Sequence, residues 1–589
     1  MTLPASFTAT LVDEWVRAGV TDAVVAPGSR SSPLALALLG DDRIRVHVRL
    51  DERSAGFFAV GLALSSCRPV VVVVTSGTAA AELHPAVVEA DLAGVPLVVC
   101  TADRPPELRG VGAAQTIDQQ HLFGRAVRHF ADPGVPDEAG RRHWRSFASR
   151  LVAEATCGPR GPGPVHANLP FREPFGGRAD DLPPARDGAR PWHEVVTGDD
   201  ASKAAVERLV REVGVARRGV VVAGRGAAVG DPTGAVALAA AAGWPVLADS
   251  LAFPRRPGAG VVAAWDAIVR SATALTALRP EVVLWLGAPP ASRALSAWVS
   301  VLTDAGASQV LVDPHGRFGD PGRAAGAVLA AAPGGLCRRA TDAVARAGGR
   351  RGGWLEAWGA AEAAAQAAID AVLGGFSQLT EPGIARHVVA GVPADSTLVV
   401  SSSMPIRDVD AWAALRDGAP VVYANRGANG IDGVVSTVLG AAAHRAPPGP
   451  RGPARTFGLL GDLAFFHDLS ALVRGTHENV IDATIVVVDN SGGGIFSFLP
   501  YAEEVGPAVF ERGFATPQSP DLGAVAEALG CQVTRVSSPG ELVAALGDAE
   551  PPGVRVVIAR TERAANAAVH AALETAVATA VGDALAGGR

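Results

Sequence analysis

Short apolar runs rich in β-branched residues recur along the whole chain and alternate with stretches of helical periodicity. Continuous runs of this kind are typical of parallel strands that are buried on both faces of a sheet. Their alternation with helices predicts doubly wound parallel sheets, an α/β fold. The runs predicted as strands are Val24–Ala26, Val70–Thr75, Leu97–Thr101, Gly219–Ala223, Val282–Leu286, Val310–Asp313, Thr397–Ser401, Thr456–Leu460, Ala483–Asp489 and Val554–Ala559.

Two stretches interrupt this alternation and divide the chain. Gly176–Glu194 is rich in Gly, Pro and charged residues, and Arg346–Gly353 reads RAGGRRGG. Both compositions are typical of linkers. The length of 589 residues suits several domains, and we expect three α/β domains in series, at residues 1–178, 195–345 and 355–589.

A single lysine, Lys203, stands among 52 Lys and Arg residues, and it excludes two kinds of chemistry. A Walker-type phosphate loop needs a lysine directly after a glycine, whereas Lys203 lies in the stretch DDASKAA. Schiff-base enzymes, including those that use pyridoxal phosphate, need a lysine nucleophile, and the polar helix start around Lys203 does not suit one. The formal charge of −7 gives no electrostatic reason to expect nucleic acid as a partner.

Cysteine spacing and hydropathy indicate the compartment. The five cysteines are far apart and form no Cys-x-x-Cys pair, which argues against a metal cluster or a disulfide framework and suits a reducing cytoplasm. Asp13, Glu14 and Arg17 lie where a signal peptide would be apolar. No apolar run approaches the ~18–20 residues of a membrane span. We therefore expect a cytoplasmic protein without a membrane span.

The turns between strands and helices are the places to search for a site, because ligands of open α/β sheets bind beyond the carboxyl ends of strands. Pro27–Pro33 and Thr75–Ala79 combine glycine with hydroxyl residues before a helix, which suits an anion, although helix capping explains both about as well. Gly224–Gly230 resembles a dinucleotide fingerprint, but its third glycine falls one place late and no suitable acidic residue follows. We expect a Rossmann-like middle domain without a nucleotide.

Two strand ends in the last third of the chain carry oxygen ligands. Gly461 and Asp462 follow one predicted strand, and Asn490 with a glycine turn follows the next. A carboxylate, a carboxamide and a backbone carbonyl make half of an octahedral Mg²⁺ shell and leave room for phosphate oxygens and water. The pair at this spacing favours a metal site over two unrelated turns.

This arrangement resembles the signature of the thiamine-diphosphate-dependent enzyme superfamily, a Gly-Asp-Gly followed further along by Asn-Asn. The superfamily has a pyrimidine-binding domain, a central Rossmann-like domain and a diphosphate-binding domain, the order of the three blocks above. Leu463 stands in place of the third glycine, as is typical of the branch in menaquinone biosynthesis, and Asp489 replaces the first Asn. The stretches most similar to that branch are APGSRSSPLALAL, RLDERSAGFFAVGLAL, TSGTAAAELHPAVVEA, TADRPPELRGVGAAQTID, NRGANGIDGVVSTVLG and DNSGGGIFSFLP.

The resemblance implies thiamine diphosphate and Mg²⁺, with Mn²⁺ as an alternative metal. Asp462, Asn490 and the carbonyl of Gly492 match the metal ligands that tether the diphosphate. Glu52 matches the catalytic glutamate, whose carboxyl holds the pyrimidine ring so that the cofactor's own imino nitrogen removes the thiazolium proton. Ile431 matches the apolar wedge that keeps the cofactor bent. The further positions matched to the cofactor are Ser403, Gly461, Leu463, Ile495 and Phe496.

Without the resemblance, Glu52 reads as an ordinary carboxylate at a helix start, and core packing explains Ile495 and Phe496 almost as well.

The implied reaction decarboxylates 2-oxoglutarate, adds the succinyl-semialdehyde carbanion 1,4 to isochorismate and releases CO₂. Both substrates carry two carboxylates, which arginine binds bidentately. The substrate positions matched by motif are Arg30, Arg104, Gln115, Arg293, Ser403, Arg407 and Arg426, with Ser292 before Arg293 where some members have lysine.

The superfamily places its cofactor between the pyrimidine domain of one subunit and the diphosphate domain of another. A homodimer or homotetramer is therefore implied, with Glu52 and Asp462 meeting at the interface. Two alternatives stay open. Another thiamine-diphosphate enzyme, such as an acetohydroxyacid synthase or a simple 2-oxoacid decarboxylase, is disfavoured by the arginine-bearing turns, because pyruvate has one carboxylate. A non-catalytic Rossmann-type binding protein is disfavoured by Glu52 together with the Asp462–Asn490 pair.

Overall fold

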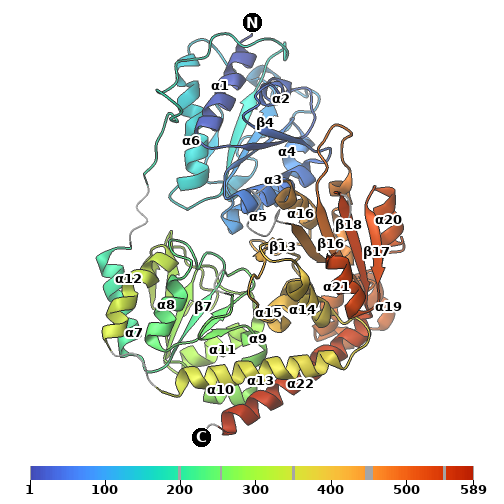
Figure 1. The fold of residues 1–589 in the computed structure, drawn as a ribbon. Helices are drawn as coiled ribbons and strands as arrows, with labels where there is room; N and C mark the ends of the chain where they lie inside the picture. Colours follow the sequence, from blue (N-terminus) through green and yellow to red (C-terminus); the bar gives the residue numbers. More distant parts are fainter. Residues whose placement is uncertain are drawn as a thin grey trace.

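The computed structural model describes residues 2–196, 201–252, 255–347, 352–444, 455–547 and 552–587. The chain forms three six-stranded parallel sheets in succession, each flanked by helices (Figure 1). This confirms the predicted fold class. Gly176–Glu194 contains neither helix nor strand, whereas residues 348–351 of the second predicted linker lie outside the described residues. The proposed domain limits stay a prediction.

The first sheet has the strand order β2-β1-β3-β4-β6-β5, so the direction of winding reverses between β1 and β3. Its strands are β1 (Asp22–Val25), β2 (Arg45–Val48), β3 (Val70–Val74), β4 (Leu97–Asp103), β5 (Phe130–Ala131) and β6 (Pro164–Pro170). The helices around it are α1 (Leu3–Arg17), α2 (Ser32–Leu39), α3 (Glu52–Ser66), α4 (Thr78–Glu82), α5 (His84–Ala93) and α6 (Trp144–Cys157).

The third sheet repeats the topology of the first strand for strand, in the order β14-β13-β15-β16-β18-β17. Its switch point therefore lies between β13 and β15. Its strands are β13 (Thr397–Val400), β14 (Val421–Tyr423), β15 (Thr456–Gly461), β16 (Ala483–Asp489), β17 (Gln532–Val536) and β18 (Val554–Arg560). The helices of this part are α13 (Trp354–Gly374), α14 (Glu381–Gly391), α15 (Met404–Trp412), α16 (Val434–Ala443), α17 (Asp462–His467), α18 (Tyr501–Glu504), α19 (Pro507–Phe510), α20 (Leu522–Ala528), α21 (Pro539–Gly547) and α22 (Arg563–Gly587).

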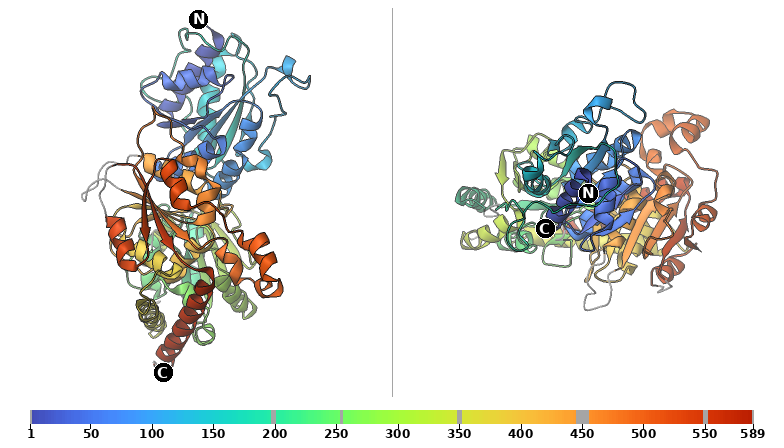
Figure 2. Two further views of the ribbon diagram at one scale, coloured as in Figure 1. Left: turned by 90° about the vertical axis from the view of Figure 1, so that its right-hand side faces the viewer. Right: turned by 90° about the horizontal axis from the view of Figure 1, so that it is seen from above.

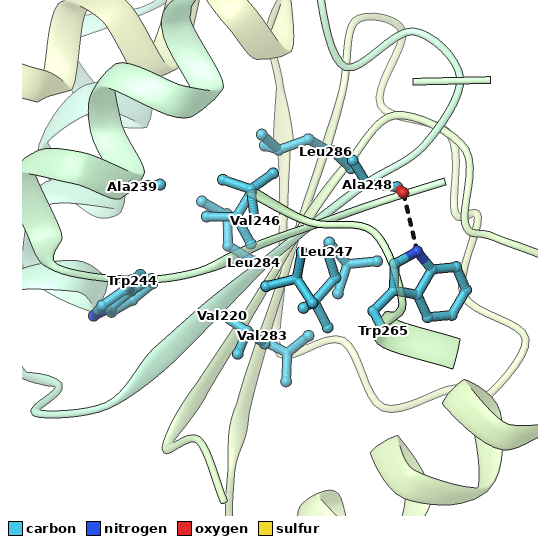
Figure 3. Close-up of a cluster of buried hydrophobic side chains, with 14 of the residues drawn as sticks. Val220, Ala239, Trp244, Val246, Leu247, Ala248, Trp265, Val283, Leu284 and Leu286 are labelled. Carbon is cyan, nitrogen blue, oxygen red and sulfur yellow. Dashed lines mark hydrogen bonds between the residues drawn. The ribbon is translucent and has the colours of Figure 1, made fainter. Parts of the chain in front are cut away.

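The middle sheet has the order β12-β11-β10-β7-β8-β9, which is the order typical of dinucleotide-binding domains. Its buried core includes Val246, Leu284 and Leu286, and the Trp265 indole donates a 2.9 Å hydrogen bond to the carbonyl of Ala248 (Figure 3). The strands are β7 (Gly219–Ala223), β8 (Val246–Ala248), β9 (Val261–Val262), β10 (Val282–Leu286), β11 (Ser308–Asp313) and β12 (Ala327–Ala330). The helices are α7 (Lys203–Val215), α8 (Gly234–Ala242), α9 (Trp265–Ile268), α10 (Ala272–Ala277), α11 (Arg293–Asp304) and α12 (Pro333–Arg346).

The glycine turn after β7 packs against the chain itself. The amide of Gly224 donates to Leu286 O (3.1 Å), and that of Ala288 donates to Arg225 O (2.9 Å). A side chain at Gly224 would collide with the carbonyl of Ala288. This backbone lies at the switch point of the middle sheet, where a dinucleotide-binding domain holds the pyrophosphate, and its close packing explains the glycine.

Two long helices of the third part pack on the middle domain. Helices α13 and α22 run side by side (Figure 1). The molecule is elongated, with its termini at opposite ends (Figure 1 and the left view of Figure 2). Apolar residues of both helices, among them Trp358, Ile369, Leu573 and Val577, belong to the same buried cluster as the middle sheet. The middle and third domains are thereby joined through a shared core.

Helices α3 and α16 join the first domain to the third (Figure 1). The carboxylate of Asp468, which is fully buried, accepts hydrogen bonds from Ser54 Oγ (3.2 Å) on α3 and from the amide of Ser436 (2.6 Å) on α16. Burial raises the pKa of Asp468 to about 6, against the lowering effect of these hydrogen bonds. Two glycines, Gly61 and Gly440, lie where the helices cross.

We expect Gly440→Ala to lower the thermal unfolding midpoint by about 5 °C or more, because the new methyl group would collide with the carbonyl of Phe58. Gly359→Ala is the matched control, since Gly359 lies inside α13 with open space around it. Alanine there favours the helix and should leave the midpoint equal or slightly higher. Equal midpoints for the two variants in differential scanning fluorimetry would contradict the close crossing of α3 and α16.

Candidate cofactor and substrate site

The three residues matched to the metal lie together at the carboxyl ends of two neighbouring strands. Strands β15 and β16 pair in parallel with Gly461 opposite Val488, which brings Asp462 and Asn490 to the same edge of the sheet. Asp462 Oδ2 accepts a 2.7 Å hydrogen bond from the amide of Gly492. The predicted proximity of carboxylate, carboxamide and glycine turn is thus present in the structure.

The local geometry fits a cation with a diphosphate. Asn490 Nδ2 donates to Glu381 Oε1 (2.8 Å), and the buried Asn490 Oδ1 has no partner among the described residues. An unpaired buried amide oxygen is costly unless a ligand uses it. A Cβ at Gly461 would meet open space, whereas one at Gly492 (φ +128°) would collide with the carbonyl of Ala515. The donors are the hard oxygens that Mg²⁺ prefers, and diphosphate oxygens would complete the shell.

Burial dominates the electrostatics of this edge. It raises the pKa of Asp462 to about 6, and the charge of Asp489 raises it further, whereas the amides of Gly492 and Leu463 and the charge of Arg563 lower it. A buried carboxylate of this kind is stabilised in its charged form by a bound cation. Burial and the nearby Asp408 also raise the pKa of Glu381, to about 7.

Glu52 is the first residue of α3 and follows the helix cap Asp51, whose side chain accepts from Ser54 N. Its carboxyl group is partly buried and forms no hydrogen bond with another of the described residues. Burial is the largest cause of its raised pKa, with smaller effects from Asp51 and Glu82. No hydrogen bond or ion pair links Glu52 to Asp462 or Asn490 within the described part of this chain. Leu50, two positions before Glu52, is 71% exposed.

Ile431 lies in the segment between β14 and α16 and is partly buried against the core shared by the first and third domains. Ile495 and Phe496 lie in a short 3₁₀ helix, Gly494–Phe498, directly after the glycine turn. The ring of Phe496 meets that of Phe514 edge to face, with centroids 5.9 Å apart. Phe496 therefore has a packing role in addition to any contact with a cofactor.

Three of the matched arginines gather where the third domain meets the middle one. The charges of Arg426 and Arg293 lower the pKa of Arg407, after burial, which is the largest cause. Arg407 donates to the carbonyl of Ser403. Ser403 follows β13, directly precedes α15 and has an unusual φ of +75°. Leu463 is partly buried and follows Asp462 beyond the adjoining strand β15. Ser403 and Asp462 therefore lie on either side of the sheet switch point, at the same carboxyl edge of the sheet.

The other two matched arginines gather in the first domain. Burial, followed by the charge of Arg104, lowers the pKa of Arg30, and Arg104 donates to Ser76 Oγ. Gln115 Nε2 donates to the carbonyl of the same Ser76 (3.0 Å). The Arg30 guanidinium donates to Phe171 O (2.7 Å) and lies over the ring of Phe175.

None of these five guanidinium groups forms an ion pair with a carboxylate in the part of the chain that the structure describes. Many other arginines do, for example Arg145 with Asp13 and Glu14. Arginines grouped against their mutual repulsion and without a carboxylate partner are suited to binding an anionic ligand. The structure thus provides two cationic groups, one in the first domain and one where the middle and third domains meet.

Sequence reasoning missed several carboxylates near the site. Glu381 on α14 holds Asn490, and Asp408 pairs with the buried His570 (2.8 Å). Glu89 on α5 contacts the segment that carries Ile431. Each is a single carboxylate or histidine on a helix, with no repeated spacing, so only its tertiary contacts reveal it.

The helices of the described residues include none of the length and apolarity needed to cross a membrane.

Three family models match the chain: the N-terminal thiamine pyrophosphate (TPP, or thiamine diphosphate) binding domain of thiamine pyrophosphate enzymes over residues 6–122, the middle domain over 186–400, and the C-terminal TPP binding domain over 422–560. A solved structure of similar fold is the Rhodococcus jostii RHA1 thiamine diphosphate-dependent 4-hydroxybenzoylformate decarboxylase, with a TM-score of 0.70 and 18% identity over 95% of this chain and 99% of that one.

Curated relatives are much more similar in sequence. The 2-succinyl-5-enolpyruvyl-6-hydroxy-3-cyclohexene-1-carboxylate synthase of Thermobifida fusca is 46% identical, over 95% of this chain and 96% of that protein. The synthase of the same name from Myxococcus xanthus is 41% identical, over 95% of each chain. The resemblance found in the sequence is thereby confirmed. The chain belongs to the thiamine-diphosphate-dependent enzymes and, within them, to the 2-succinyl-5-enolpyruvyl-6-hydroxy-3-cyclohexene-1-carboxylate synthase family.

Proposed function

We propose that this chain decarboxylates 2-oxoglutarate and adds the remaining four-carbon unit 1,4 to isochorismate, with release of CO₂, as a step of menaquinone biosynthesis. The observation that carries the proposal is the set of five matched arginines, none of which forms an ion pair within the described residues, in a chain that also brings Asp462, Asn490 and Gly492 together. The names of the relatives at 46% and 41% identity support the same activity.

Thiamine diphosphate, when bound, supplies the carbanion chemistry that a 2-oxo acid needs to lose CO₂ and form a new carbon–carbon bond. Asp462, Asn490 and the Gly492 carbonyl would hold Mg²⁺ and, through it, the diphosphate. Gly461, Leu463, Ile495 and Phe496 would border the cofactor. Glu52 would hold a proton at the pyrimidine ring nitrogen, and Ile431 would keep the two rings close.

The arginine groups explain the choice of substrates. Arg30 and Arg104 with Gln115, and Arg293, Arg407 and Arg426 with Ser403, would bind carboxylates through charge-assisted hydrogen bonds. Two dicarboxylate substrates require several cationic positions, whereas pyruvate would leave some of these guanidinium groups without an anion. This favours the proposed reaction over acetohydroxyacid synthesis.

The proposal includes a homodimer or homotetramer in which Glu52 of one subunit faces Asp462 of another. Within the described part of this chain the Glu52 carboxyl group has no hydrogen bond to Asp462 or Asn490, which suits a Glu52 that serves a partner subunit. The proposal also includes a cytoplasmic location. All five cysteines are unpaired thiols, which suits a reducing compartment.

The direct test follows isochorismate absorbance in the presence of thiamine diphosphate, Mg²⁺ and 2-oxoglutarate. We expect consumption only when all components are present, and loss of activity when any one of them is omitted. Pyruvate in place of 2-oxoglutarate serves as the control substrate. Equal turnover with pyruvate would contradict the proposed function and favour another thiamine-diphosphate carboligase.

A further inference from the structure

The segment 425–433 links β14 to α16 and carries two residues proposed for the site, Arg426 and Ile431. Its backbone has left-handed turns at Asn429 (φ +64°) and Gly433 (φ +65°). The segment contains neither helix nor strand. Its position therefore depends on contacts with other parts of the chain.

Glu89, on α5 of the first domain, makes the most specific of these contacts. Its Oε1 accepts a 2.8 Å hydrogen bond from the amide of Gly427, and its Oε2 accepts a 2.7 Å bond from the amide of Ala428. The side chain is only 2% exposed. One buried carboxylate thus binds two consecutive backbone N–H groups across a distance of more than three hundred positions in the sequence.

Close packing supports the same contact. A Cβ at Gly427 would lie 2.8 Å from the carbonyl oxygen of Glu89 and 2.7 Å from the amide of Ala93. Only glycine allows the segment to approach the end of α5 this closely. The hydrogen bonds and the missing side chain together fix the segment on the first domain.

The glycine turn of the middle domain reaches the same place. Arg225 Nη2 donates to the carbonyl of Leu92 (3.2 Å) at the end of α5. Burial raises the pKa of Glu89, and the amides of Ala428 and Gly427 and the charge of Arg225 lower it. Residues of all three domains therefore meet around the Glu89 carboxylate.

We propose that Glu89 is a positioning residue that holds the segment 425–433, and with it Arg426 and Ile431, in place for the reaction. The turn containing Arg225 completes this connection from the middle domain. The inference deepens the proposed function and rests on it for the roles of Arg426 and Ile431. The contact itself is independent of any substrate or cofactor.

A carboxylate is needed because both partners are donors. Glutamine has almost the same shape, but it offers one acceptor oxygen, and its NH₂ group would face a backbone N–H. In Glu89→Gln, one of the two charge-assisted hydrogen bonds is therefore lost, and two N–H donors face each other in its place. Glu89→Asp keeps the charge but shortens the reach, so it should retain one of the two contacts.

Hydrogen–deuterium exchange on the protein without cofactor tests the contact. We expect the amides of Gly427 and Ala428 to exchange about tenfold faster or more in Glu89→Gln, with an intermediate effect in Glu89→Asp. The matched control is Glu207→Gln, because among the described residues Glu207 pairs only with the exposed Lys203 on α7. Unchanged exchange in residues 425–433, or equal acceleration along the whole chain, would overturn the proposal.

Kinetics test the consequence. In Glu89→Gln we expect the KM for at least one dicarboxylate substrate to rise about tenfold, with a smaller fall in kcat, since Arg426 is displaced while Glu52 is untouched. A merely structural role would instead lower the unfolding midpoint and leave the KM of the folded fraction unchanged. If the wild-type protein does not turn over isochorismate, the proposed function fails, while the exchange measurement still decides the contact.

Discussion

Glu52→Gln is expected to lower kcat by about 10²–10⁴-fold while the affinity for thiamine diphosphate changes by no more than about threefold. Glutamine preserves the size of the side chain and can still hydrogen-bond to a ring nitrogen. It cannot give or take a proton there. The carboxyl group forms no hydrogen bond with another of the described residues, so its removal leaves no donor unpaired within the chain.

The measurement combines calorimetric titration of thiamine diphosphate with steady-state turnover. Glu154→Gln serves as the control, because Glu154 pairs with Arg150 (3.3 Å) on the outer face of α6. That variant should behave like the wild type in both measurements. Decarboxylation of 2-oxoglutarate by Glu52→Gln at the wild-type rate would remove Glu52 from the proposed proton transfer.

The strands at the centre of each sheet could be predicted from the sequence, and those at the edges could not. All ten predicted runs form strands, whereas the six edge strands, among them β2, β5 and β14, were missed, and the inner strands β6 and β8 also lie outside the ten runs. Edge strands are buried less, so their sequences carry weaker apolar runs. Strand β6 was missed for another reason: its sequence PVHANLP places His166 and Asn168 in the interior.

Those two side chains are stabilised by contacts that no local pattern reveals. Thr101 Oγ1 lies 2.7 Å from His166 Nε2, and Asn168 Nδ2 donates to Asp103 (2.9 Å). A polar residue in a buried strand is tolerated when such partners exist. A sequence read alone does not show the partners, so the run appears too polar for a strand.

The residues of the candidate site also fall into those that could be predicted from the sequence and those that could not. Asp462 and Asn490 could be predicted because both follow strong strands of one parallel sheet, and parallel strands end at the same edge. The arginines could be selected only through the resemblance, because arginine is common throughout this chain. Glu381 and Glu89 could not be predicted, because their roles depend on contacts between helices and turns that are far apart in the sequence.

Asp462→Ala is expected to weaken Mg²⁺-dependent binding of thiamine diphosphate at least about 100-fold, or ~2.7 kcal/mol, and to abolish turnover. The change removes the only carboxylate of the proposed metal set, leaving neutral oxygens that hold a divalent cation poorly. Calorimetric titration at fixed Mg²⁺ gives the affinity. Asp583→Ala, at an exposed position of α22, is the matched control and should bind as the wild type does. Undiminished cofactor binding by Asp462→Ala would exclude Asp462 as a metal ligand.

Co-expression of two separate chains, one carrying Asp462→Ala and the other Glu52→Gln, tests whether a site spans two subunits. If Glu52 of one chain serves Asp462 of another, a mixed dimer of the two inactive variants contains one site with both native residues and one with neither. Random pairing makes half of the dimers mixed, so co-expression should restore about a quarter of the wild-type activity. If both residues of a site come from one chain, every site in every dimer stays defective. Restored activity would therefore require subunits to share the site, and its absence in confirmed mixed dimers would mean that Glu52 and Asp462 of one site come from the same chain.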